Sequence, residues 1–424
     1  MIDSIQAQSR SRSFLLPAPV VILWLLILAA VSILISLSPH AWDVAVYRNA
    51  IRSLAAGHDP YLDGIARQKL YYNQTVHPAG DPPFSYVYSP VTIPILRVIT
   101  AFPVWLSGSI YWSIFVVGAL AEIWVVMRAV EENERRLFLY LAPITVFFPG
   151  LLANGIVLGG NIAYILYGTV LLAAVIGWRR NTWIWFYLAV LVASCIKAPL
   201  LSLAVIPLLS ARKQWIPTAI ASIIGISLFT VTPIIWPDLF PHYLQAIDLQ
   251  FSFNHDFGCS PAGLFSGFLL DHDMPYFPAG LVFYLGYAIP VFSLLIYFSK
   301  RFFAGYFPLQ QWMPVLLVGV ILLNPRIIEY DVAAITIPLA LIVWRFLSTF
   351  NTPFQRALWF GIVFVITNCI ALRSWGLWKL AEAPFLVFCF AVGCWSLLKL
   401  SNSHDEWLER VEIETLQNGT YAAV

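Results

Sequence analysis

The chain contains many long runs of apolar residues, and these runs constrain its fold more than any other feature. Many reach the length that a helix needs to cross about 30 Å of hydrocarbon. The sequence is 60% hydrophobic and only 11% charged, whereas a soluble domain carries roughly 25% charged residues. The alternating pattern of membrane β-barrel strands, about ten residues each, is not evident. We therefore predict an all-α polytopic membrane protein.

About twelve runs are predicted to cross the membrane, starting from a cytoplasmic N-terminus. They lie near residues 17–37, 108–127, 138–157, 161–178, 182–196, 197–210, 216–236, 278–298, 306–323, 332–347, 357–373 and 383–399. Short basic connectors support this orientation, because cytoplasmic loops carry an excess of Lys and Arg. These connectors are residues 178–180, 211–213, 299–301 and 354–356. We treat residues 1–400 as one membrane domain and residues 401–424 as a cytoplasmic tail.

Two choices decide this count of crossings. Residues 86–103 hold prolines and an arginine, so we predict a helix that lies against the outer face of the membrane. Residues 182–210 are divided at Lys197 and Pro199, because proline removes a backbone donor and restricts the residue before it. On this map the external segments, where we expect the chemistry, are residues 38–107, 237–277 and 324–331.

A short amphipathic helix is predicted directly after the first span. From Tyr47 to Ala55 the apolar positions recur at the i, i+3 and i+4 spacing of one helical face, and Arg48 lies on the other face. Asp43 extends the apolar row, where a charge is costly unless a contact or a function uses it. An N-cap role is the alternative, although Val46 denies Asp43 the partner of a capping box.

Several motifs of the external segments, taken together, resemble one enzyme family. In chain order they are DVAVY at 43–47, AGHDPY at 56–61, YVYSP at 86–90, GGN at 159–161, IKAP at 196–199 with the basic pair 212–213, and NPRIIEY at 324–330. In order and spacing they resemble the bacterial polyprenyl-phosphate-mannose-dependent alpha-mannosyltransferases, which are integral membrane glycosyltransferases of the GT-C superfamily. The resemblance covers most of residues 40–345.

The resemblance implies a GT-C-like glycosyltransferase of the plasma (inner) membrane, with its site on the periplasmic or extracellular face. Such an enzyme moves a sugar, mannose or another hexose, from a polyprenyl-phosphate donor to a hydroxyl of a glycolipid or envelope glycan. In that family the Asp after the first span is the catalytic base, and Asp43 holds the matching position. Tyr330 stands where the family usually has His, which near neutral pH transfers protons more readily than Tyr. The departure at Tyr330 therefore also allows the chain to be a diverged or inactive member of the family.

The candidate substrate-binding residues lie in the external segments. Arg offers a bidentate grip on a lipid phosphate and Lys a point charge. Lys197 is flanked by apolar runs, where a charge costs about 2.5–3.5 kcal/mol at mid-helix on insertion scales. It therefore binds phosphate, snorkels to headgroups, or pairs with Glu329 or Asp331. The full set of candidates is Tyr47, Arg48, Tyr88, Asn161, Lys197, His255, Arg326, Glu329 and Tyr330.

Metal and nucleic-acid chemistry are not expected. His255 and Asp256 are adjacent, but two ligands do not make a metal site, and we expect no cofactor beyond the lipid-linked donor. A net charge of +2 does not indicate nucleic acid as a partner. The expected partners are the donor, a glycolipid or glycan acceptor, and membrane lipids.

Two other classes of protein stay open at this point. A transporter or flippase of lipid-linked sugars often shows paired repeats with broken helices in matching positions. Here the two halves show no evident similarity, and the break at Lys197 has no counterpart. A non-catalytic accessory subunit is the second alternative.

Overall fold

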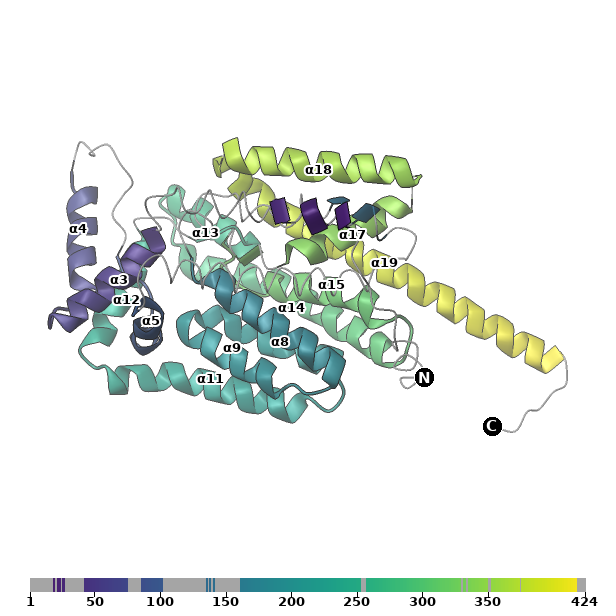
Figure 1. Cartoon of the computed structure of the whole chain (residues 1–424), viewed down its shortest axis with the longest axis horizontal. Coiled ribbons are helices and arrows are strands. Elements are labelled where there is room, and N and C mark those ends of the chain that lie inside the picture. The colour runs from purple at the N-terminus through teal and green to yellow at the C-terminus, as the bar shows by residue number, and fades with distance from the viewer. Residues whose placement is uncertain are drawn as a thin grey trace.

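The computed structural model shows a bundle of helices (Figure 1). It describes residues 42–74, 85–101, 161–252, 257–328, 331–332, 335–349, 352–373 and 375–417, with a few more near residues 22 and 138. These residues contain helices and connecting segments but no β-strand, which confirms the all-α class for the part of the chain that is described. The predicted spans 17–37, 108–127 and 138–157 lie almost wholly outside it.

The helices of the apolar body overlap the predicted spans, although the last of them extends well beyond the predicted span 383–399 at both ends. They are α8 (Ala163–Arg180), α9 (Ile184–Ile196), η1 (Ala198–Ala204), α10 (Val205–Ser210), α11 (Trp215–Ile235), α14 (Tyr276–Phe303), α15 (Leu309–Leu322), α17 (Thr336–Ser348), α18 (Pro353–Arg373) and α19 (Trp375–Gln417). Among the described residues, four stretches are long and apolar enough to cross a membrane: Trp215–Ile235, Tyr276–Phe303, Pro353–Ile370 and Leu380–Glu406. A total of twelve crossings stays a prediction.

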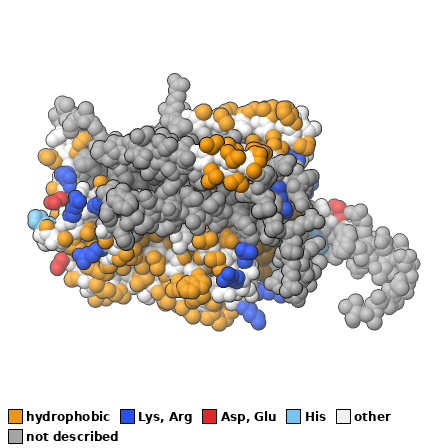
Figure 2. Space-filling model, in the orientation of Figure 1, with side chains coloured by type: hydrophobic (Ala, Val, Ile, Leu, Met, Phe, Trp, Pro, Cys, Tyr) orange, Lys and Arg blue, Asp and Glu red, His pale blue; other side chains and the backbone are white. Residues whose placement is uncertain are grey.

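Apolar side chains cover the outside of this body as well as its core. On α11, Ile223 and Ile234 are 64% and 76% exposed, and Figure 2 shows hydrophobic side chains along the same edge of the molecule. Inside, every residue of α15 from Trp312 to Leu322 is buried. Large apolar patches are rare on soluble proteins, so a body that is apolar both inside and outside supports a membrane location.

The shorter helices of the predicted external segments gather at one end of the body, on the left of Figure 1. Two of them were predicted: α3 (Trp42–Ala55) after the first span, and α5 (Thr92–Thr100) within residues 86–103. Three others were not predicted, namely α4 (Leu62–Tyr72), α12 (Leu239–Ser252) and α13 (Pro261–Asp271). For α13 a signal was present, because Ser260 is a favourable N-cap residue and proline follows it at the first helical position.

The chain breaks at Lys197, as predicted. Helix α9 ends at Ile196, and Lys197 is extended, with φ −127° and ψ 100°. The chain then returns along η1 and α10. At the end of that return, Ser210 accepts a hydrogen bond at 2.9 Å from Trp178, which lies near the start of α9. Lys197 therefore sits at the tip of a helical hairpin.

The four basic connectors lie together at the end of the bundle opposite that tip. A chain of contacts joins the segments beside them: Trp178 Nε1 to Ser210 Oγ (2.9 Å), Ser299 Oγ to the Leu209 carbonyl (2.9 Å), the Arg345 guanidinium to the Gln310 carbonyl (3.0 Å), and Arg356 over the ring of Trp344 (5.3 Å). The basic connectors thus lie at one end of the bundle, and the short helices of the predicted external segments lie at the other.

The two ends of the bundle are expected to react from opposite sides of the membrane. Asp63 on α4 and Arg212 in a basic connector are both exposed. In a Cys369→Ser background, which removes the exposed native thiol, a membrane-impermeant thiol reagent added to intact cells should label Asp63→Cys. It should label Arg212→Cys only after permeabilisation. Labelling of both variants in intact cells would contradict this topology.

Candidate active site

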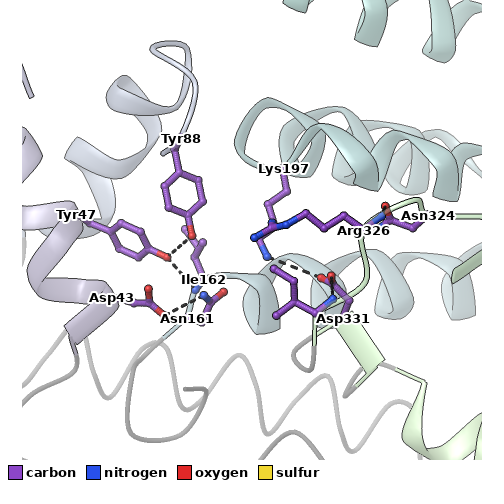
Figure 3. A network of polar contacts seen from close by, with 10 residues as sticks. Asp43, Tyr47, Tyr88, Asn161, Ile162, Lys197, Asn324, Arg326 and Asp331 are labelled. Carbon is purple, nitrogen blue, oxygen red and sulfur yellow. Dashed lines mark hydrogen bonds and ion pairs between the residues drawn. The ribbon is translucent and has the colours of Figure 1, made fainter. Parts of the chain in front are cut away.

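A buried carboxylate lies at the end of the bundle opposite the basic connectors, where α3 meets the start of α8. Asp43 is in the first turn of α3, where the helix dipole favours a negative charge, and it is only 8% exposed. Asn161, just before α8, donates a hydrogen bond from Nδ2 to Asp43 Oδ2 at 2.9 Å (Figure 3). The structure therefore brings together two residues that lie 118 positions apart in the chain and that were both predicted as site residues.

Two tyrosines pack beside this carboxylate. The hydroxyls of Tyr47, one turn after Asp43 on α3, and Tyr88, before α5, are 2.9 Å apart (Figure 3). The backbone N–H of Ile162 donates to the Tyr47 hydroxyl at 3.4 Å, so α3 is tied a second time to the start of α8. These contacts fix the rotation of α3 and hold Asp43 toward the bundle.

Lys197 and Asp331 form an ion pair on the other side of the site. Lys197 Nζ lies 3.8 Å from Asp331 Oδ1, and their side chains are 14% and 6% exposed. The other oxygen of Asp331 accepts a hydrogen bond from the backbone N–H of Ile328 at 2.9 Å. The carboxylate also interacts with the phenol of Tyr167 on α8. An ion pair with Asp331 was one of the alternatives to phosphate binding for Lys197, and the structure contains this pair.

Arg326 reaches toward the same space from the turn after α15 (Figure 3). Its backbone N–H donates to the side-chain oxygen of Asn324 at 3.3 Å. Its guanidinium lies 5.8 Å from the ring centroid of Phe251, a cation–π distance. Two cations, Lys197 and Arg326, thus face the half of the site that holds Asp43 and Tyr88.

A second layer of contacts supports the Asp43 side of the site. The Tyr61 hydroxyl donates to the Tyr88 carbonyl at 2.7 Å, while Asp59 Oδ1 accepts hydrogen bonds from the backbone N–H groups of Tyr61 and Leu62. The other oxygen of Asp59 lies 2.7 Å from His242 Nδ1 on α12. The HDPY motif, residues 58–61, therefore forms a turn, and the contact of Asp59 with His242 links α12 to the site.

Burial changes the acid–base behaviour of Asp43. It raises the pKa of the Asp43 carboxyl from 3.8 to about 7, while the hydrogen bond from Asn161 and the positive charge of Lys197 lower it. Burial also raises the pKa of the Tyr88 hydroxyl, and the Asp43 charge acts in the same direction. At neutral pH, Asp43 is therefore divided between its protonated and ionised forms, whereas Tyr88 keeps its proton.

The structure brings most of the predicted site residues together. Asp43, Tyr47, Tyr88, Asn161, Lys197 and Arg326 form the cluster of Figure 3. Arg48 is half-buried on α3 but takes no part in the contacts just described. Glu329, Tyr330 and His255 lie outside the described residues. The sequence reading missed Tyr167, since a tyrosine inside an apolar run is typical of interfacial belts.

No family model, curated protein or solved structure matches the chain. Among the residues that the structure describes, no group of three or more His, Cys, Asp or Glu side chains is arranged to hold a metal ion.

Replacing Lys197 by Gln is expected to raise the pKa of Asp43 further. The variant removes the positive charge that stabilises the ionised carboxylate, and burial then acts with less opposition. Infrared or carbon-13 NMR titration of the Asp43 carboxyl in lipid nanodiscs measures the change. Lys213→Gln, at the basic end, is the matched control and should leave the titration unchanged. An unchanged pKa in Lys197→Gln would show that the two groups are not coupled.

Replacing Asp43 by Asn is expected to stabilise the protein at alkaline pH. The folded pKa of about 7 exceeds the ordinary value of 3.8, so ionisation costs folding free energy as the pH rises between these values. The increase in the free energy of unfolding should be absent near pH 4 and reach up to about 4 kcal/mol at pH 8. Melting temperatures of both proteins in the same nanodiscs, measured across this range, test the expectation. A variant that melts earlier at pH 8 would count against it.

Proposed function

We propose that this chain is a membrane glycosyltransferase that moves a sugar from a polyprenyl-phosphate donor to a hydroxyl acceptor on a glycolipid or envelope glycan. The observation that carries the proposal is the cluster of Figure 3, in which a buried carboxylate with a pKa of about 7 faces two cations at one end of an apolar bundle. A base and a cationic phosphate site are the two parts that such a reaction needs.

In this proposal Asp43 acts as the general base. Its carboxylate takes the proton of the acceptor hydroxyl while the acceptor oxygen attacks the anomeric carbon. The bond from that carbon to the phosphate oxygen breaks, and polyprenyl phosphate leaves. The single displacement inverts the anomeric centre. Because phosphate leaves readily, one carboxylate suffices, and a base with a pKa near the working pH is the most effective.

Lys197 and Arg326 are proposed to bind the donor phosphate. A lysine ammonium has three donors, so its ion pair with Asp331 is compatible with a second anion. Asp331 would then hold Lys197 in place between turnovers. Asn161 would keep the Asp43 carboxylate turned toward the acceptor, and Tyr88, whose hydroxyl lies 2.9 Å from that of the buried Tyr47, offers polar and aromatic surface to a sugar.

The arrangement of the two ends supports a site on the outside of the plasma membrane. The basic connectors gather at the end opposite Asp43, and basic loops stay in the cytoplasm. Asp43 would then lie at the periplasmic or extracellular face, where the prenyl chain of the donor can remain in hydrocarbon while its phosphate reaches Lys197. Both termini would be cytoplasmic.

Asp43→Asn is expected to lower the rate of sugar transfer by roughly 10²- to 10⁴-fold, the usual contribution of a general base. The purified protein in nanodiscs is given a radiolabelled polyprenyl-phosphate sugar and a lipid acceptor, and the glycoside product is counted. Asp63→Asn, an exposed carboxylate on α4, is the matched control and should retain full activity. A folded Asp43→Asn protein with full activity would rule out this mechanism.

The same purified protein, placed in proteoliposomes, separates the enzyme from a flippase. Turnover of the donor to a new glycoside supports the transferase. Movement of the labelled lipid between leaflets of a proteoliposome, with its sugar–phosphate bond intact, would instead favour transport.

A further inference from the structure

We propose that residues 257–263, which lead into α13 and include its first three residues, are a positioning element that holds the turn at 323–328 and thereby places Arg326 at the donor phosphate. This inference rests on the proposed function and assigns a role in the same site to a segment that does not touch the reacting atoms. Its residues are Phe257 to Gly263, which the sequence reading left as part of an external loop.

Two polar contacts join the segment to the turn. The Ser260 hydroxyl donates to the Pro325 carbonyl, and the backbone N–H of Cys259 donates to the Ile327 carbonyl at 2.5 Å. Ser260 is fully buried, and its oxygen also accepts from the Gly263 N–H at 2.8 Å, which caps α13. One hydroxyl therefore fixes the start of α13 and the residue before Arg326 at the same time.

Gly258 allows this close approach. Its φ is +77°, and a Cβ there would overlap the Ile327 carbonyl and approach Arg326 Cγ at 3.2 Å. An L side chain is therefore disfavoured by the backbone conformation and by the lack of space. The segment and the turn can lie this close only with glycine at this position.

The turn carries the cationic half of the site. On its far side, the Tyr284 hydroxyl of α14 donates to the Leu323 carbonyl at 2.7 Å. At its end, the Ile328 N–H donates to Asp331, which pairs with Lys197. Phe251 on α12 lies under the Arg326 guanidinium. A shift of the turn therefore moves Arg326 directly and Lys197 through Asp331, while the Asp43 side, built from α3, α5 and α8, stays in place.

Ser260→Ala is the first test. Loss of the hydroxyl releases the turn from α13, and we expect the KM for the polyprenyl-phosphate sugar to rise roughly three- to tenfold. The KM for the acceptor should stay unchanged, because the Asp43 side does not move. Gly258→Ala should give a larger rise, and Ser260→Thr, which keeps the hydroxyl, should restore most of the donor affinity.

Ser299→Ala is the matched control. Ser299 is buried, and its hydroxyl also donates to a backbone carbonyl, that of Leu209, but at the basic end of the bundle. A purely structural effect of losing such a bond appears in both variants. A donor-specific effect appears only in Ser260→Ala.

Binding of polyprenyl phosphate, followed by tryptophan fluorescence in nanodiscs, gives a readout that needs no transfer activity. The inference is overturned if folded Ser260→Ala and Gly258→Ala proteins bind polyprenyl phosphate as tightly as the wild type. It is supported if both bind more weakly and Ser299→Ala does not. Absence of sugar transfer by the wild type would count against the proposed function but would leave this comparison of binding intact.

Discussion

The rest of the site depends on the Asp43 carboxylate, which is buried and accepts a hydrogen bond from Asn161. Burial raises its pKa, and the hydrogen bond opposes this effect. A charged carboxylate removed from water is costly unless it is bonded and faces an opposite charge. The structure offers one hydrogen bond at 2.9 Å and the positive charge of Lys197, and the pKa is still raised to about 7. The pKa of Asp43 thus lies near neutral pH, where both the protonated and the ionised form are populated. A general base works best with such a pKa.

The fold brings the parts of this site together through the ends of helices. Asp43 begins α3, Asn161 precedes α8, Lys197 ends α9, and Arg326 follows α15. Each lies where a helix leaves unpaired backbone groups and the chain can turn a polar side chain inward. The basic connectors lie at the opposite end of the bundle, and this charge pattern predicts that the cluster around Asp43 is separated from the cytoplasmic side. Proteins often give up stability at functional sites, and a carboxylate that opposes folding at high pH fits that pattern.

Much of this architecture could be predicted from the sequence, because apolar length and basic loops are local signals. The break at Lys197 followed from Pro199, because proline disfavours a helical residue before it. Helices α4 and α12 could not be placed in the same way, since short helices at a membrane surface are stabilised by tertiary contacts more than by propensity.

For the site, the motifs named Asp43, Asn161, Lys197 and Arg326 as candidate residues, and the structure places the four in one cluster, while their roles stay predictions. It could not foresee the role of Gly258, whose importance arises only where its backbone meets Ile327. Nor could it choose between an ion pair and a phosphate site for Lys197, because that choice depends on the distance to Asp331. Contacts between segments far apart in the chain cannot be predicted from a single sequence.

The pH dependence of the sugar-transfer rate tests the central claim most directly. If Asp43 must be ionised to accept the acceptor proton, the rate constant rises tenfold per pH unit on the acid side and levels off near pH 7. A rate that is flat from about pH 5 to 8, or that falls as the pH rises through this range, would contradict the account.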